Sequence, residues 1–214
     1  MEYSELRSAL IATAIELNVS GINQGTSGNL SVRAGGGFLI TPSGMQYAAL
    51  APEDIVFMTV SGDYNAARQP SSEWRFHRDI YTARTDAAAI VHTHSVHATA
   101  LACLDRGIPA FHYMVAAAGG HDIRCAPYAT YGTQALSDFA VAALADRQAC
   151  LLAHHGAIAL GNSLSSALAL AGEVETLAHQ YLAALAVSEP MLLSTAEMDI
   201  VIEKFKTYGT NAQQ

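Results

Sequence analysis

The chain has 214 residues, of which 51% are hydrophobic, and this supplies an apolar core large enough for a globular domain. That composition excludes a disordered chain. The formal net charge is −8 and no segment carries a basic run, which argues against nucleic acid or an anionic membrane surface as a partner.

Helical and strand patterns alternate along the chain. Apolar residues at helical spacing predict helices, and short apolar runs bounded by turn residues predict strands. In chain order we expect a helix at 4–18, strands at 29–33, 38–41 and 55–60, a helix at 70–83, a strand at 87–91, helices at 98–104 and 131–145, strands at 150–154 and 157–160, and helices at 164–187 and from 195. Alternating strands and helices without a repeat or linker predict one α/β domain over residues 1–214.

Three widely separated cysteines, none in a C-x-x-C pair, indicate reduced thiols and a cytoplasmic protein. The first residues include several charged ones, so they predict neither a signal peptide nor a transit peptide. No segment is apolar over a membrane-spanning length.

The most informative motif is His92-Thr93-His94, which directly follows the buried strand predicted at 87–91. Residues two apart on a strand point to the same face, so both imidazoles would project together from its end. This is a geometry that binds metal.

A second histidine pair, His154-His155, follows another apolar strand. Neighbours on a strand face opposite ways, so only one of the two can easily join His92 and His94, and the spacing does not say which. Three histidines with an open or carboxylate position are typical of catalytic zinc. The alternative is a set of hydrogen-bonded histidines in the core or on the surface.

Three short segments are rich in glycine and hydroxyl residues: 25–29, 41–44 and the pair Ser71-Ser72. Each alone reads as an ordinary turn or cap. Together they suggest an anion cradle, because glycine permits close backbone approach and a helix beginning at Ser71-Ser72 would offer free N–H groups to a phosphate.

The cradle contains no lysine, and the only lysines in the chain are Lys204 and Lys206. A Schiff-base mechanism needs a desolvated lysine, so carbonyl chemistry here would have to use a metal as its electron sink. Glu73 would lie in the first turn of the helix at 70–83, where it either complements the helix dipole or supplies a fourth metal ligand that can act as a base.

These motifs resemble the class II aldolase and adducin-head family over nearly the whole chain. The similarity rests on Asn23-Gln24-Gly25-Thr26, the segment Pro70-Ser71-Ser72-Glu73-Trp74-Arg75-Phe76-His77, His112-Tyr113-Met114, Cys125-Ala126-Pro127-Tyr128, His154-His155-Gly156 and Glu203-Lys204-Phe205-Lys206-Thr207-Tyr208-Gly209. The resemblance implies a three-layer domain whose central sheet is mixed but largely antiparallel and flanked by helices.

The resemblance also implies a role for each residue of the site. One Zn²⁺ per subunit would be held by Glu73, His92, His94 and His155. The catalytic residues would be Glu73, Tyr113 and Tyr208, with Tyr113 reaching a neighbouring subunit's site in a homotetramer. Substrate would be bound by Gly28, Asn29, Ser43, Gly44, Ser71, Ser72 and Tyr131.

The implied reaction is retro-aldol cleavage of a phosphorylated ketose through an enediolate that the metal stabilises. The similarity is strongest to members that cleave L-fuculose 1-phosphate to dihydroxyacetone phosphate and L-lactaldehyde. The family's 4-epimerases, its decarboxylases and aldolases for other sugar phosphates are the enzymatic alternatives, and a non-catalytic interaction module like the adducin head is another. Tyr131 stands where the family pattern has phenylalanine, so its hydroxyl could alter which aldehyde fits.

Overall fold

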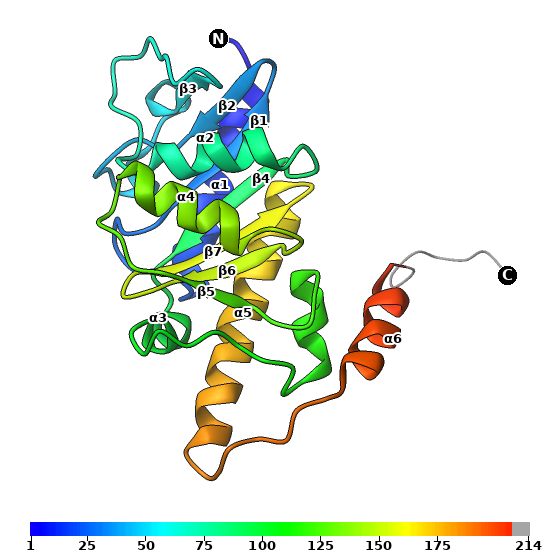
Figure 1. The fold of residues 1–214 in the computed structure, drawn as a ribbon. Coiled ribbons are helices and arrows are strands. Elements are labelled where there is room, and N and C mark those ends of the chain that lie inside the picture. The colour runs from blue at the N-terminus through cyan, green and yellow to red at the C-terminus, as the bar shows by residue number, and fades with distance from the viewer. Residues whose placement is uncertain (207–214) are drawn as a thin grey trace, which may run out of the picture.

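A computed structural model, which describes residues 1–206, is built on a seven-stranded sheet in the order β3-β2-β1-β4-β7-β6-β5 (Figure 1). All neighbouring strands run antiparallel except β5 and β6, which are parallel. The expected mixed, largely antiparallel sheet is therefore confirmed. The strands are β1 Asn29–Ala34, β2 Gly37–Ile40, β3 Val56–Thr59, β4 Ala89–Thr93, β5 Arg124–Ala126, β6 Ala149–Leu152 and β7 Gly156–Gly161.

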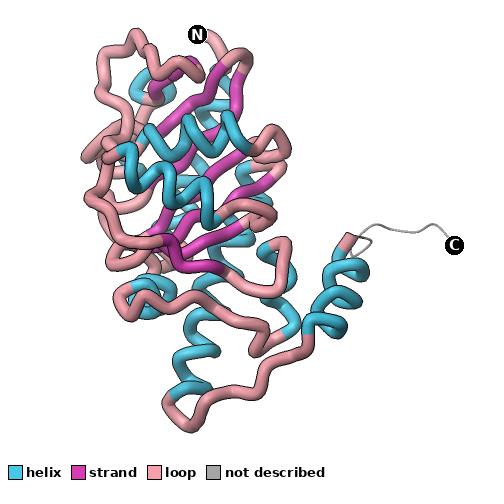
Figure 2. Tube along the Cα trace, in the orientation of Figure 1, coloured by secondary structure: helices cyan, strands magenta, loops and turns pink. Residues whose placement is uncertain are grey.

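Helices cover both faces of the sheet and complete three layers, as Figures 1 and 2 show. Helices α2 and α4 pack side by side on one face, and α1 and α5 cover the other, with α3 against α5. Helix α6 lies against the 3₁₀ segment η3. The bounds are α1 Ser4–Val19, α2 Trp74–Ala83, α3 Val96–Ala102, α4 Gln134–Ala143, α5 Leu164–Leu185, α6 Thr195–Phe205, η1 Tyr47–Ala49, η2 Pro52–Asp54 and η3 Tyr113–Ala118.

Strand β4 lies at the centre of the sheet and is buried on both faces. Ile90 packs in the core beneath α2 and α4, whereas Ala89 and Val91 pack in the core beneath α1. A strand covered on both sides needs a continuous apolar run, which explains why this segment does not alternate with polar residues. His92 lies on the Ile90 face, because its ring contacts Phe76 of α2.

Two predicted helices begin later than expected. Helix α2 begins at Trp74 rather than residue 70, because Ser71 donates its backbone N–H to the Thr41 carbonyl and residues 72 and 73 form a turn. Helix α4 begins at Gln134 rather than residue 131, because Gly132 takes a left-handed φ of 73° and Thr133 caps the helix. The free N–H groups of a helix start are therefore not at Ser71-Ser72.

The sequence did not predict β5 or η3. Strand β5 is only three residues long and includes Arg124, so it offers no apolar run or alternation. Among residues 1–206, no helix has both the length and the apolarity that crossing a membrane requires.

Candidate metal centre

The central strands β4 and β7 place the first histidine. Their antiparallel register sets His92 opposite Ile158, and the His92 side chain is fully buried. Its Nδ1 lies 3.0 Å from the carbonyl oxygen of Ala157. A carbonyl only accepts, so Nδ1 carries a ring proton and Nε2 is the nitrogen that faces the interior of the site.

His94 follows the last residue of β4 and points toward the same place. Its Nε2 lies 3.0 Å from Nε2 of His92, and its backbone N–H donates to the Asn23 side chain at 3.2 Å. Burial, together with the neighbouring His92 and His155, lowers the pKa of His94 to about 4. The imidazole is thus neutral at pH 7, the form that binds a metal.

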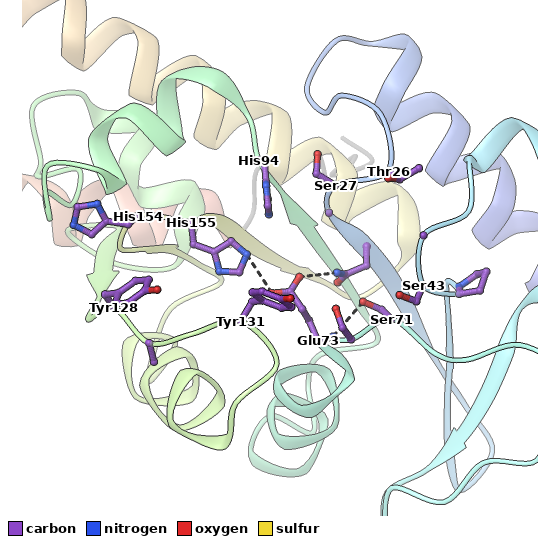
Figure 3. Close-up of a pocket in the computed structure, with 16 residues that line it drawn as sticks. Thr26, Ser27, Ser43, Ser71, Glu73, His94, Tyr128, Tyr131, His154 and His155 are labelled. Atoms are coloured by element: carbon purple, nitrogen blue, oxygen red, sulfur yellow. Dashed lines mark hydrogen bonds and ion pairs between the residues drawn. The ribbon is translucent and has the colours of Figure 1, made fainter.

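The turn between β6 and β7 separates the two candidates that the sequence left open. His154 has a left-handed φ of 54°, which sends its side chain away from that of His155. Nε2 of His155 lies 3.1 Å from Oε1 of Glu73, whereas Nε2 of His154 lies 3.7 Å from Asp105 on a half-exposed side chain (Figure 3). His155 joins the cluster and His154 does not. The predicted strand 150–154 was too long, because β6 ends at Leu152.

Glu73 occupies the N-cap position of α2, one residue before the helix, with 6% of its surface exposed. Its Oε2 lies 3.2 Å from Nε2 of His92 and accepts a hydrogen bond from Asn29 at 2.9 Å. Burial favours the neutral acid, but His92 and His155 outweigh it and hold the pKa of Glu73 well below its usual range. The side chain is therefore a carboxylate.

These four side chains fit a divalent metal ion. The ligand atoms of Glu73, His92, His94 and His155 all lie within 4.8 Å of one another. Tetrahedral zinc with bonds of about 2.0–2.1 Å holds its ligands roughly 3.3 Å apart, close to the separations found here. Oε1 of Glu73 is buried without a hydrogen-bond partner among the described residues, so a cation would satisfy it. The donor set suits zinc, manganese, cobalt and iron alike.

A cavity of about 320 Å³ opens outward from this cluster. All seven residues predicted to bind substrate line it. Among residues 1–206, no lysine or arginine lines it, so a phosphate there would be held by hydroxyl and backbone N–H groups. Gly28 allows the backbone to approach β4, since a Cβ there would lie 2.6 Å from the His92 carbonyl oxygen.

The side chains of two of the predicted phosphate-binding residues already have partners inside the protein. Asn29 is buried between Glu73 and His77, and Oγ of Ser71 accepts the backbone N–H of Glu73 at 3.3 Å. The Asn29 side chain thus braces the metal cluster.

The predicted catalytic tyrosines lie outside this pocket. Tyr113 begins η3, is half-exposed and is not among the residues lining the cavity. Tyr208 lies outside the described residues.

Three residues outside the predicted anion cradle and outside the predicted site set also line the cavity: Tyr128, Ala129 and His154. The ring of Tyr128 meets that of His154 edge-on at 5.9 Å. These residues come from two loops, where hydrophobic periodicity gives no signal. The turn signals in these two segments are the proline before Tyr128 and the glycine after His155.

The seven-stranded fold thus carries a candidate metal site formed by Glu73, His92, His94 and His155. Comparison with known proteins gives the family. Residues 8–182 match the family described as "Class II Aldolase and Adducin N-terminal domain", and the chain belongs to it. It is a class II aldolase, an enzyme type that depends on a metal ion.

Two curated relatives differ in their named substrate. A 5-methylthioribulose-1-phosphate/5-deoxyribulose-1-phosphate aldolase from Rhodospirillum rubrum is 59% identical over 97% of this chain and 94% of its own. An L-fuculose phosphate aldolase from Escherichia coli is 51% identical over the full length of both. A solved L-fuculose 1-phosphate aldolase superposes with a TM-score of 0.93 at 42% identity, covering 96% of this chain and 98% of its own.

Proposed function

We propose that this enzyme cleaves a ketose 1-phosphate with a deoxygenated far end, releasing dihydroxyacetone phosphate and a short aldehyde. The observation that carries the proposal is the convergence of Glu73, His92, His94 and His155 at the inner end of a pocket lined by glycine and hydroxyl residues. That arrangement offers a metal for the sugar carbonyl and neutral donors for the phosphate.

The proposed cofactor is Zn²⁺, held by Glu73, His92, His94 and His155. When bound, it would act as a Lewis acid and stabilise the charge that develops as the C3–C4 bond breaks. His92 is oriented for this role, because its Nδ1–H donates to the backbone and leaves Nε2 for the metal.

The phosphate would be bound by the rim of the cavity. Backbone N–H groups and hydroxyls are the available donors, from Gly28, Asn29, Ser43, Gly44, Ser71 and Ser72. Ser43 uses its backbone N–H to bond the Gln69 carbonyl, so its hydroxyl is the group to contact a phosphate. The metal's charge compensates for the missing lysine and arginine side chains.

Glu73 is the proposed base. In the direction of synthesis it would take the C3 proton of dihydroxyacetone phosphate, and in cleavage it would return that proton. Its burial and an Oε1 that makes no hydrogen bond suit a proton acceptor.

Tyr113 is proposed to donate a proton to the C4 oxygen in the direction of synthesis and to accept that proton in cleavage. Because it is half-exposed and lies outside this chain's pocket, we propose that it acts in a neighbouring subunit of a homotetramer, with Tyr208 closing the site. An exposed tyrosine on a short 3₁₀ segment can reach beyond its own subunit.

L-Fuculose 1-phosphate is one candidate substrate, supported by the Escherichia coli relative. The second is 5-deoxyribulose 1-phosphate or its 5-methylthio analogue, supported by the Rhodospirillum rubrum relative at higher identity. Each candidate places a group without a hydroxyl at the far end of the sugar. Tyr128 and Tyr131 line the cavity and would meet that group.

The test is a panel of these three sugar phosphates with zinc-loaded enzyme, with and without chelator, measuring dihydroxyacetone phosphate and identifying the aldehyde. Chelator-sensitive release from at least one of them supports the proposal. An epimerised sugar or carbon dioxide as product would replace it with an epimerase or a decarboxylase. Protein that binds no zinc and converts none would be a non-catalytic module.

A further inference from the structure

A continuous line of buried polar side chains runs from Glu73 into the interior between α2 and β1. Three of its members are four residues apart, at and within α2, and two are two residues apart on β1. Both sets therefore lie on the faces where α2 and β1 meet. All are at most 6% exposed: Glu73, His77 and Tyr81 from the helix side, and Asn29 and Ser31 from the strand.

The hydrogen bonds connect these side chains in one unbroken order. Nδ2 of Asn29 lies 2.9 Å from Oε2 of Glu73, and Oδ1 of Asn29 lies 2.5 Å from Nε2 of His77. The other ring nitrogen, Nδ1 of His77, lies 2.6 Å from Oγ of Ser31, which in turn lies 2.9 Å from the hydroxyl of Tyr81.

The carboxylate end fixes the direction of every bond in this line. Nδ2 of Asn29 donates to Oε2 of Glu73, so the carbonyl of Asn29 faces His77. His77 then carries its proton on Nε2. Burial lowers the pKa of His77 to about 3, which excludes the doubly protonated ring. Its Nδ1 therefore accepts from Ser31, and Ser31 accepts from Tyr81.

We propose that His77, with Ser31 and Tyr81 behind it, is a positioning residue that locks the Glu73 carboxylate through Asn29. Every donor in the line points toward Oε2, so that oxygen is anchored, whereas Oε1 makes no hydrogen bond, has Nε2 of His155 3.1 Å away, and is left for the metal or the substrate. Aligned hydrogen bonds polarise one another in the same sense. The inference rests on the proposed role of Glu73 in metal binding and proton transfer.

The first test compares His77→Leu, which breaks the line at nearly constant volume, with His77→Gln, whose amide can still donate to Asn29 and accept from Ser31. Loss of a group that orients a metal ligand weakens metal affinity or activity by about 10–100-fold. We expect zinc affinity and kcat to fall by that factor in His77→Leu, with KM little changed, and His77→Gln to recover most of the loss.

Graded variants separate positioning from packing. Ser31→Ala should cost less than His77→Leu, and Tyr81→Phe least, because each leaves the links nearer to Glu73 intact. Ile80→Val is the matched control: it removes one buried methyl group from the same helix and should leave zinc affinity unchanged. Ser31→Ala also provides the test if His77→Leu fails to fold.

The third measurement does not use activity. Nitrogen-15 spectra of histidine-labelled, metal-free protein should show His77 protonated at Nε2 and bare at Nδ1. A proton on Nδ1 overturns the direction of the line. Three results would overturn the positioning role. The first is that His77→Leu keeps its zinc affinity and kcat, and the second is that Ile80→Val loses them equally. The third is that folded His77→Gln does not recover them. If the wild-type enzyme cleaves no sugar phosphate, the proposed function fails, but zinc affinity and the nitrogen signals still decide this inference.

Discussion

Gly156 is the residue where β7 passes closest to β4, and alanine there should damage the metal centre. A Cβ at this position would lie 2.2 Å from the carbonyl oxygen of Thr93 and 3.1 Å from Cδ2 of His94. The φ of Gly156 lies outside the left-handed region, so the effect would be steric alone. The clash would therefore occur beside two of the metal ligands, His94 and His155.

The size of the effect follows from that contact. A Cβ stays at least about 3 Å from a carbonyl oxygen, so the strands must separate locally by roughly 0.8 Å. Metal bonds tolerate only about 0.2 Å, and we expect zinc affinity to fall by about tenfold or more. Overpacking costs about 1–3 kcal/mol, which lowers Tm by roughly 2–12 °C for a chain of this size.

Thermal unfolding of the zinc-free protein and zinc titration against a chromophoric chelator measure the two effects separately. Gly36→Ala is the control, because a Cβ at Gly36, in the turn between β1 and β2, meets nothing within 4 Å. It should match the wild type in zinc affinity. If Gly156→Ala also keeps the Tm and zinc affinity of the wild type, the close packing of β4 and β7 does not set the ligand geometry.

Four further outcomes are expected. Glu73→Gln should fold normally while kcat falls by about 10²–10⁴-fold, as loss of a general base predicts, and near-normal turnover would remove Glu73 from the chemistry. Tyr113→Phe should lose kcat at unchanged metal content, whereas loss of zinc would assign the residue to the metal site. His77 has a pKa of about 3 when folded and about 6.5 when unfolded, so below pH 6.5 the unfolded state binds more protons and stability falls by up to about 1.4 kcal/mol per pH unit. Urea titrations of zinc-free protein should show a shallower decline for His77→Gln than for wild type, and equal slopes would contradict this. Zinc at 100 times its Kd should stabilise the enzyme by about 2.7 kcal/mol, and calorimetry showing no rise in Tm would refute binding to the folded state.

The larger elements of the fold were predictable because each buries a regular pattern. Helix α5 and strand β4 follow apolar spacings that local sequence displays. The first residues of α2 and α4 could not be predicted. The start of α2 depends on the hydrogen bond between Ser71 and Thr41, and the start of α4 depends on the left-handed conformation of Gly132. Strand β5 owes its place to its parallel partner β6 rather than to its own three residues.

The candidate site shows the same division between local and long-range causes. The pairing of His92 with His94 follows from strand geometry, so sequence alone indicated it. The choice of His155 over His154 depends on a left-handed turn residue that spacing does not reveal. The hydrogen bond between Asn29 and His77 could not be predicted, because it depends on how α2 packs against β1. The sequence shows only that Glu73 and His77 are four residues apart.

The central pairing of β4 with β7 also determines when the metal site forms as the chain folds. Glu73 and His92 come early in the sequence, whereas His155 reaches them only after β7 has docked beside β4. Contacts between such distant segments form late, because the long intervening loop must close first. Zinc bound by all four residues would therefore slow unfolding more than it speeds folding. The ion would stabilise the sheet only after β7 has paired with β4. A nascent chain that ends before β7 lacks a complete zinc site.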